Sequence, residues 1–317
     1  MMKNKKLLIT LLVLVTGFSC SAGRASAVSA RTGITVSPAF QLVAIASGAT
    51  QQPVSFTITN NEPSAQTLDF SVRDFSSLND SGGLFFVGTN PSALQKKYGL
   101  AKWFSLSQSS LTIQPKQTTT LSANILNLPD LASGGHYGAL LISIGGQSNS
   151  QPIGLKPIAS SLLFVTKPNG ATHQLSLSNV TYKKSWFKLP GQVTLRFYNP
   201  GNTHVVPRGE VTLKDPRGTI IAKGIINQNS NIILPGAYRQ YSANLTRLSH
   251  SNKFGKYSLR ADFRFDGIDQ FRSYQIGFWH IPVMLSTLVA LVFIVILVGG
   301  RWMYKNYKSW DHSKPNK

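Results

Sequence analysis

The feature that most constrains the fold is an apolar run from Phe278 to Gly300, in which His280 is the single ionisable side chain. As a helix rising about 1.5 Å per residue, the run is about 30 Å long, which matches the hydrocarbon core of a bilayer. Arg301 and Lys305 follow it, and the aromatic Trp302 and Tyr304 stand beside them. Because basic residues mark the cytoplasmic side, the pattern predicts a membrane-spanning helix over 278–300 and a basic cytoplasmic tail over 301–317.

The N-terminus has the pattern of a secretory signal peptide. Lys3, Lys5 and Lys6 precede an apolar stretch, and small residues end at Ala27, so the sequence predicts a signal peptide over 1–27. An uncleaved signal anchor is the alternative. Cys20 is either lipidated or removed with the signal peptide. We therefore predict a single-pass cell-membrane protein whose N-terminal domains are extracellular.

The predicted mature chain contains no cysteine, which excludes thiol catalysis, disulfides and cysteine-based metal sites. The histidines are scattered, and no carboxylate cluster accompanies them. The carboxylates Asp262, Asp266 and Asp269 lack the spacing of a calcium loop. The sequence contains no phosphate loop, nucleophile elbow or dinucleotide fingerprint. We expect no enzyme activity, no cofactor and no metal.

Short alternating segments fill the remainder, for example 54–59, 193–198 and 257–265. Period-two alternation rich in Val, Ile, Thr and aromatic residues predicts half-buried antiparallel strands. Many such strands predict an all-β fold of two tandem immunoglobulin-like β-sandwich domains, over 28–168 and 171–277, before the C-terminal transmembrane helix.

An internal repeat supports two domains. Ser122-Ala123-Asn124 recurs as Ser242-Ala243-Asn244, and Gly135 and Tyr137 recur as Gly255 and Tyr257, all at an offset of 120. Upstream and with a shifted offset, strand-like segments end at Asn60 and at Asn199, and each runs into a turn. The repeat predicts the same strand order in both domains.

The first domain carries an insert near 76–104. Its first part has the turn residues Asn79 to Gly83, and its second part predicts a short helix that begins after Pro91 and Ser92. The insert either builds a binding surface or covers an open sheet edge. Its candidate contact residues are Lys96, Lys97, Lys102 and Trp103.

The second domain is the basic one. Residues 28–170 carry eight Lys and Arg against five acids, whereas residues 171–277 carry fifteen against five. Between two predicted strands lies a loop with three lysines and two large aromatic residues, which predicts a contact with an anionic surface. In the alternative, the aromatic residues cover the sandwich core and the lysines are solvated. The candidate residues are Lys183, Lys184, Trp186, Phe187 and Lys188.

Four short segments carry a family resemblance: Ile34-Thr35-Val36-Ser37-Pro38, Thr59-Asn60-Asn61, Asn199 to Val205, and Asp215-Pro216-Arg217-Gly218. Together with the signal peptide and the terminal helix, they resemble the WxL-interacting cell-surface proteins of Gram-positive bacteria. The resemblance implies a first domain associated with cell-wall attachment and a second that binds ligands or partner proteins. The first segment is also similar to the periplasmic pilus chaperones, but those are soluble and their peptide-anchoring basic pair has no match here.

We therefore predict a membrane-anchored extracellular scaffold that contacts cell-wall polymer or other surface proteins, and no nucleic acid. The alternative is a non-catalytic subunit of a membrane protein complex. An exposed sheet edge in the first domain would favour the scaffold, because sandwiches often bind extended partners by strand addition.

Overall fold

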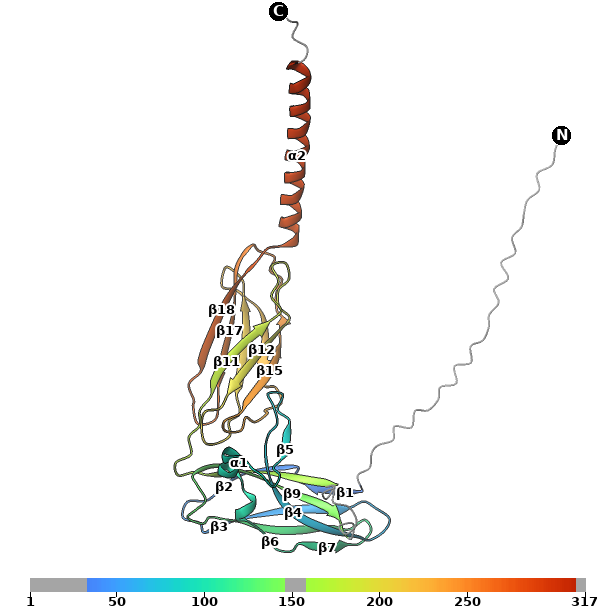
Figure 1. Cartoon of the computed structure of the whole chain (residues 1–317), viewed down its shortest axis with the longest axis vertical. Helices are drawn as coiled ribbons and strands as arrows, with labels where there is room; N and C mark the ends of the chain where they lie inside the picture. Colours follow the sequence, from blue (N-terminus) through green and yellow to red (C-terminus); the bar gives the residue numbers. More distant parts are fainter. Residues whose placement is uncertain (1–32, 146–157, 312–317) are drawn as a thin grey trace, which may run out of the picture. The chain divides into compact units, whose positions relative to one another are not determined.

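The computed structural model describes residues 33–145 and 158–311 of the chain. The predicted signal peptide and Cys20 lie outside the described residues. The first part consists of two facing sheets, one of strands β1-β3-β8-β6 and one of β2-β10-β9-β4-β5, with β7 also paired to β4 (Figure 1). The strands are β1 (Ile34–Ser37), β2 (Phe40–Ala44), β3 (Gln51–Asn60), β4 (Gln66–Ser77), β5 (Leu84–Phe86), β6 (Phe104–Leu106), β7 (Ser110–Ile113), β8 (Thr118–Leu126), β9 (Gly134–Ile144) and β10 (Ala159–Lys167).

The first sandwich shows the predicted alternation of buried and outward-facing residues along its strands. In β3, Val54, Phe56 and Ile58 are buried while the residues between them face outward. Strand β3 pairs antiparallel with β8, where Phe56 lies opposite Leu121. Strand β9 is buried almost along its whole length, because one face packs in the sandwich core and the other in a second cluster around Tyr137. A strand buried on both faces carries little alternation in its sequence.

The second part is a separate pair of sheets with its own hydrophobic core, one of β11-β12-β15 and one of β16-β14-β13-β17-β18 (Figure 1). Its strands are β11 (Ser176–Tyr182), β12 (Gln192–Tyr198), β13 (Arg208–Lys214), β14 (Ile220–Ile226), β15 (Tyr238–Asn244), β16 (Thr246–Arg247), β17 (Gly255–Arg264) and β18 (Arg272–His280). The two-sandwich β fold agrees with the prediction. The finer immunoglobulin-like assignment is not confirmed, and the domain boundaries 28–168 and 171–277 stay predictions.

The repeated asparagines occupy the same structural position in the two sandwiches. Asn60 and Asn199 are both fully buried at the end of a strand. The Asn199 amide donates to the carbonyls of Thr203 (2.8 Å) and Ile233 (3.0 Å), and its oxygen accepts from Gly201 N–H (2.9 Å). Asn60 makes the matching bonds to Ser64 and Ile113 and accepts from Glu62. Each asparagine therefore ties a strand to its turn and to a neighbouring segment.

The insert contains the end of β4, β5, a short helix α1 (Ala93–Tyr98) and a 3₁₀ turn at Ala101–Trp103. Ser92 caps α1 and Gln95 completes the capping box, so the helix predicted after Pro91 and Ser92 is confirmed. The turn before β5 brings Asp80 to the second sandwich, where its carbonyl accepts from Gln240 N–H of the edge strand β15 (2.7 Å). At this point the insert covers a sheet edge, the second of its two predicted roles.

The C-terminal helix α2 (Val283–Asp311) contains one segment, Val283–Lys305, that is long and apolar enough to cross a membrane. The helix begins later than the predicted Phe278. Phe278 and His280 belong to β18, where they pair with Tyr257 and Gly255 of β17. Hydropathy alone cannot separate the two elements, because the apolar end of an edge strand runs directly into the apolar helix.

Candidate functional site

The candidate site starts where the chain crosses between the two sheets of the first sandwich. Strand β1 pairs antiparallel with β3 in one sheet, and β2 pairs parallel with β10 in the other. The crossing is held by the Ser161 hydroxyl, which donates to the Pro38 carbonyl (2.7 Å), and by Leu162 N–H, which donates to the Ala39 carbonyl (3.0 Å). Strand β2 is thereby placed at the end of its sheet.

The outer edge of β2 is unpaired among the described residues, since β2 is the terminal strand of its sheet. The carbonyl of Ala39 and the N–H of Ile45 both bond to β10. Backbone groups alternate in direction along a strand, so those of Phe40 and Leu42 point away from β10. The edge therefore offers the N–H and C=O of Phe40 and Leu42 to an additional strand.

The same two residues also expose large apolar side chains. Phe40 is 55% exposed and Leu42 is 57% exposed. The Phe40 ring packs edge-on against Phe164 of β10, with ring centroids 6.4 Å apart, and Leu162 is half-buried opposite Phe40. We call Phe40, Leu42 and Leu162 the β2 edge surface. Backbone and side chains at this surface together suit an extended segment with apolar side chains.

The β2 edge surface continues into a buried aromatic cluster. Phe164 contacts Phe75 (5.3 Å between centroids) and Tyr137 (5.9 Å), and His204 of the second sandwich packs on both Tyr137 and Phe164. Burial lowers the pKa of His204 to about 4, against a smaller opposing effect of Asp266. Burial likewise raises the pKa of Tyr137 well above its usual value. Both side chains are therefore neutral near pH 7, which suits their buried positions in an aromatic cluster.

The predicted insert residues do not form one contact surface. Lys96 and Lys97 are exposed on α1. Lys102 pairs with Asp130 at 2.5 Å, and Trp103 is only 9% exposed and donates its indole N–H to the same carboxylate at 3.0 Å. Trp103 therefore belongs to the core of the first sandwich and offers no surface for a partner.

The basic loop between β11 and β12 holds its aromatic side chains outside the core. Trp186 is 66% exposed and Phe187 is 50% exposed, so the alternative in which they cover the sandwich is wrong. Lys183, Lys184 and Lys188 are exposed beside them. The Trp186 carbonyl accepts from Ile281 N–H at 2.6 Å, which ties the loop to the residues before α2. The structure thus brings all five predicted loop residues together on one surface.

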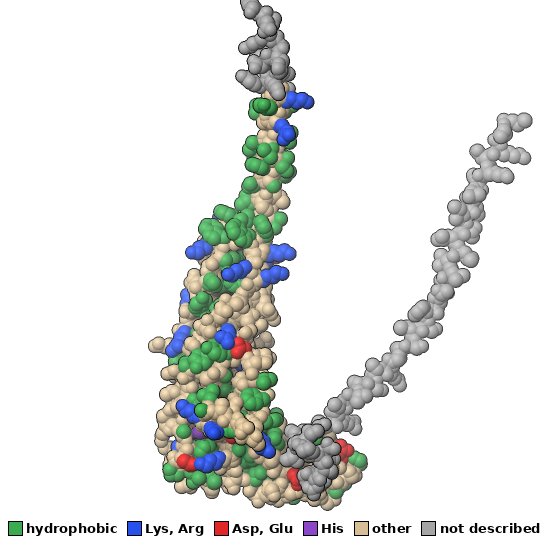
Figure 2. All heavy atoms as spheres, in the orientation of Figure 1, with side chains coloured by type: hydrophobic (Ala, Val, Ile, Leu, Met, Phe, Trp, Pro, Cys, Tyr) green, Lys and Arg blue, Asp and Glu red, His purple; other side chains and the backbone are tan. Residues whose placement is uncertain are grey.

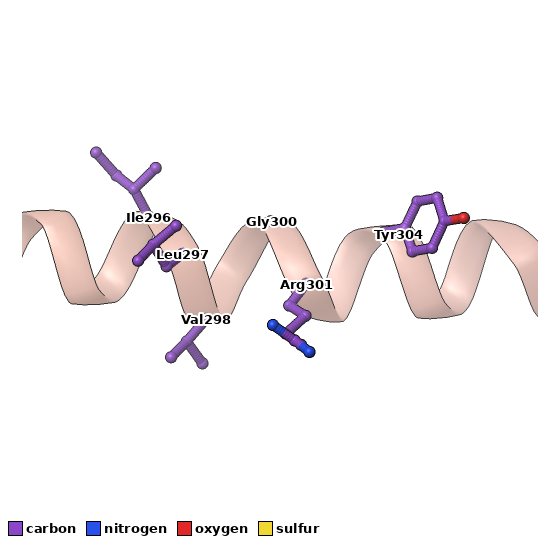
Figure 3. Close-up of a pocket in the computed structure, with 6 residues that line it drawn as sticks. All are labelled: Ile296, Leu297, Val298, Gly300, Arg301 and Tyr304. Carbon is purple, nitrogen blue, oxygen red and sulfur yellow. The ribbon is translucent and has the colours of Figure 1, made fainter.

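A hollow along α2 is not a ligand site. It is lined by Ile296, Leu297, Val298, Gly300, Arg301 and Tyr304. Figure 3 shows that all of these residues come from one helix and that their side chains project away from it. Because one helix supplies every lining residue, no second element closes the hollow around a ligand.

Several carboxylate and histidine side chains of the described residues could bind a metal but already have protein partners. Among the described residues, no group of three His, Cys or carboxylate side chains is placed to hold an ion. Asp262 pairs with Arg260 and Asp266 with Arg208, at 2.9 and 2.7 Å. Both ring nitrogens of His136 face backbone carbonyls. The expectation of no enzyme activity stays a prediction.

Comparisons with known proteins give structural similarity only. No family model matches the chain, and no curated protein matches it. A chain of the chaperone-tip adhesin complex of CFA/I fimbriae is 10% identical, with a TM-score of 0.42, over 79% of this chain and 99% of that one. The class 5 fimbriae chaperone CfaA is 8% identical, with a TM-score of 0.41, over 79% and 100%. A chain of the CsuC-CsuE chaperone-tip adhesion subunit complex of Acinetobacter baumannii is 11% identical, with a TM-score of 0.34, over 77% and 97%.

These comparisons correct the family prediction. The solved structures named above are fimbrial chaperones or complexes that contain one, and the resemblance to WxL-interacting cell-surface proteins is wrong. The predicted function is wrong as well, both as a scaffold that contacts cell-wall polymer or surface proteins and as a subunit of a membrane complex. The resembling segments contain mainly strand ends and turns, which many β-sandwiches share. We transfer no residue role from the chaperones.

Proposed function

We propose that this chain is a membrane-anchored polypeptide-binding protein that captures an extended segment of another protein by strand addition at β2. The observation that carries the proposal is the combination at Phe40 and Leu42 of outward backbone groups with exposed apolar side chains. Exposed sheet edges that carry apolar residues invite strand pairing, and proteins often protect them with charge, proline or a bulge. The described residues place none of these on β2 itself.

The partner segment is expected to alternate apolar and polar residues. Its apolar side chains would pack on Phe40, Leu42 and Leu162, and its polar ones would face the opposite side of the extended sheet. The side chains on the core face of β2, Gln41 and Val43, are already engaged, since the Gln41 amide donates to the Ser55 carbonyl (3.1 Å) and Val43 packs on the core. Specificity therefore comes from one face of the partner strand.

The helix α2 supplies the anchor in this proposal. We place the two sandwiches outside the cytoplasm, because Arg301 and Lys305 lie at the C-terminal end of the apolar segment. The many basic residues of the second sandwich do not oppose this orientation, since large domains are translocated largely regardless of their charge.

The test is binding of a synthetic peptide of ten alternating Thr and Val residues to the full chain in lipid nanodiscs, followed by fluorescence anisotropy. Leu42→Pro removes one outward N–H that has no partner within the sheet, so we expect the fold to persist and binding to weaken about tenfold or more. Leu42→Ala keeps the N–H and isolates the side-chain contribution. Leu128→Ala changes a leucine that is 45% exposed outside the strands and serves as the control. Equal binding by Leu42→Pro and Leu128→Ala would refute the proposal.

A further inference from the structure

We propose that one end of the second sandwich docks on the lipid surface of the membrane that holds α2. The surface consists of the β11–β12 loop, Trp279 near the end of β18 and Phe254 directly before β17, and we call it the membrane-contact surface. It is separate from the β2 edge surface and does not depend on the function proposed for that edge. Its residues are Lys183, Lys184, Trp186, Phe187, Lys188, Phe254 and Trp279.

The covalent connection to α2 keeps this surface close to the bilayer. Trp186 accepts a hydrogen bond from Ile281 N–H at 2.6 Å, and α2 begins at Val283. Two residues of chain extend at most about 7 Å. The loop therefore stays next to the start of the spanning segment at any angle between the helix and the sandwich.

The aromatic side chains are of the kind that favours a membrane interface. Trp186, Phe187 and Trp279 are 66%, 50% and 56% exposed, and Phe254 packs beside Trp279 with ring centroids 5.7 Å apart. Trp186 and Trp279 line one surface hollow, and a contiguous group of exposed aromatic side chains marks an interaction surface. Figure 2 shows hydrophobic side chains gathered where the second sandwich meets α2. At the headgroup level, tryptophan rings are stabilised by partial burial.

The lysines supply the matching charge. Lys183, Lys184 and Lys188 surround the two loop aromatics, and within the described part of the chain none of the three forms an ion pair. Figure 2 shows further Lys and Arg side chains on the second sandwich near the same end. Exposed basic residues beside a spanning helix are attracted to anionic lipid headgroups. Charge and aromatic residues thus point to one occupant, an anionic bilayer surface.

The shape of the loop presents these residues outward. The Ser185 hydroxyl accepts from the N–H groups of Phe187 (3.3 Å) and Lys188 (3.2 Å), which closes a tight turn. Behind the turn, Tyr182 packs on Phe278 of β18, with ring centroids 5.4 Å apart. The base of the loop is therefore fixed to the sandwich while its tip projects.

The experiment measures the depth of a fluorescent label in the bilayer. Full-length chain with Cys20→Ser and Phe187→Cys is labelled with an environment-sensitive dye and reconstituted in vesicles with about a third anionic lipid, with headgroup and acyl-chain spin labels as quenchers. The control is Phe271→Cys, a residue 58% exposed directly before the start of β18, about 26 Å from Trp279 along the chain direction of the strand. Thermal unfolding of both labelled chains confirms that they fold.

We expect lipid quenching of the label at position 187 and little or none at position 271. Replacing Lys183, Lys184 and Lys188 with Gln should reduce the ratio of inserted to withdrawn label about fivefold for each lysine lost. Equal quenching at positions 187 and 271 would overturn the proposal. Unchanged quenching after replacement of the lysines would overturn the role of anionic headgroups. Neither outcome depends on peptide binding at β2, so this proposal and the proposed function fail separately.

Discussion

Replacing Asn199 with Leu should destabilise the second sandwich strongly. The side chain is fully buried, and its three hydrogen bonds are made with backbone groups of Thr203, Ile233 and Gly201. Leucine has a similar volume but no polar atom, so three buried backbone groups lose their partners. Each buried group left without a partner costs about 1–3 kcal/mol. Allowing for relaxation of the turn, we expect a loss of about 3–5 kcal/mol, a large part of the stability of an ordinary domain.

Thermal and urea unfolding of the full chain in detergent measures this loss. The control is Asn179→Leu, an exposed position on β11 in the same sandwich, which should change the free energy of unfolding by less than about 0.5 kcal/mol. Asn60→Leu should have an effect similar to that of Asn199→Leu in the first sandwich, because Asn60 makes the equivalent bonds. If Asn199→Leu unfolds like Asn179→Leu, the conclusion that the buried amide holds the turn is wrong.

Two further predictions concern pH and use the same unfolding measurement. Burial lowers the pKa of His204 to about 4, so the neutral ring stabilises the fold above about pH 6.5, and this contribution is lost as the pH falls towards 4. His204→Gln should remove this pH dependence of the free energy of unfolding. If the variant and the wild type show the same pH dependence, the prediction is wrong. The pKa of Asp215 is lowered to about 2, first by its hydrogen bond from Lys253, so its contribution is present above about pH 4 and is lost as the pH falls towards 2. Asp215→Asn should be less stable than the wild type by about 2 kcal/mol at pH 6 and equally stable near pH 2, and a gap that does not narrow would refute the assignment.

Local patterns were sufficient for much of the fold. The alternation in β3 and β12 places Phe56 and Phe197 in the two cores. The offset of 120 relates Tyr137 to Tyr257 and both are buried, but Tyr257 lies in the core of the second sandwich, whereas Tyr137 lies in the separate aromatic cluster on the other face of its sheet. The long apolar helix near the C-terminus followed from composition alone, but its start did not, because Phe278 is as apolar in β18 as it would be in a helix. Alternation of apolar and polar residues and continuous apolar runs depend only on residues that are close in the chain, so they can be recognised from the sequence alone.

Contacts between distant segments could not be predicted in this way. Strand β2 has only five residues, and its partner β10 lies about 120 residues later, so nothing local indicates that Phe40 and Leu42 form a sheet edge. Trp103 was predicted as a contact residue of the insert, but its side chain is buried and donates its indole N–H to Asp130, which follows it by 27 residues. The loop at Lys183 to Lys188 was recognisable, since its lysines and aromatics are adjacent in the chain. Its proximity to α2 required the bond between Trp186 and Ile281.

Hydrogen exchange of the backbone amides of Phe40 and Leu42 is the most direct test of strand capture at β2. Exchange is measured on the full chain in nanodiscs, with the Thr-Val peptide and with the same peptide N-methylated on one edge, which cannot pair as a strand. The account predicts that both amides, open in the free protein, become protected by the unmodified peptide and remain open with the methylated one. The three samples are the free protein, the protein with the unmodified peptide and the protein with the methylated peptide. If both amides exchange equally fast in all three while the unmodified peptide is bound, the binding surface lies elsewhere.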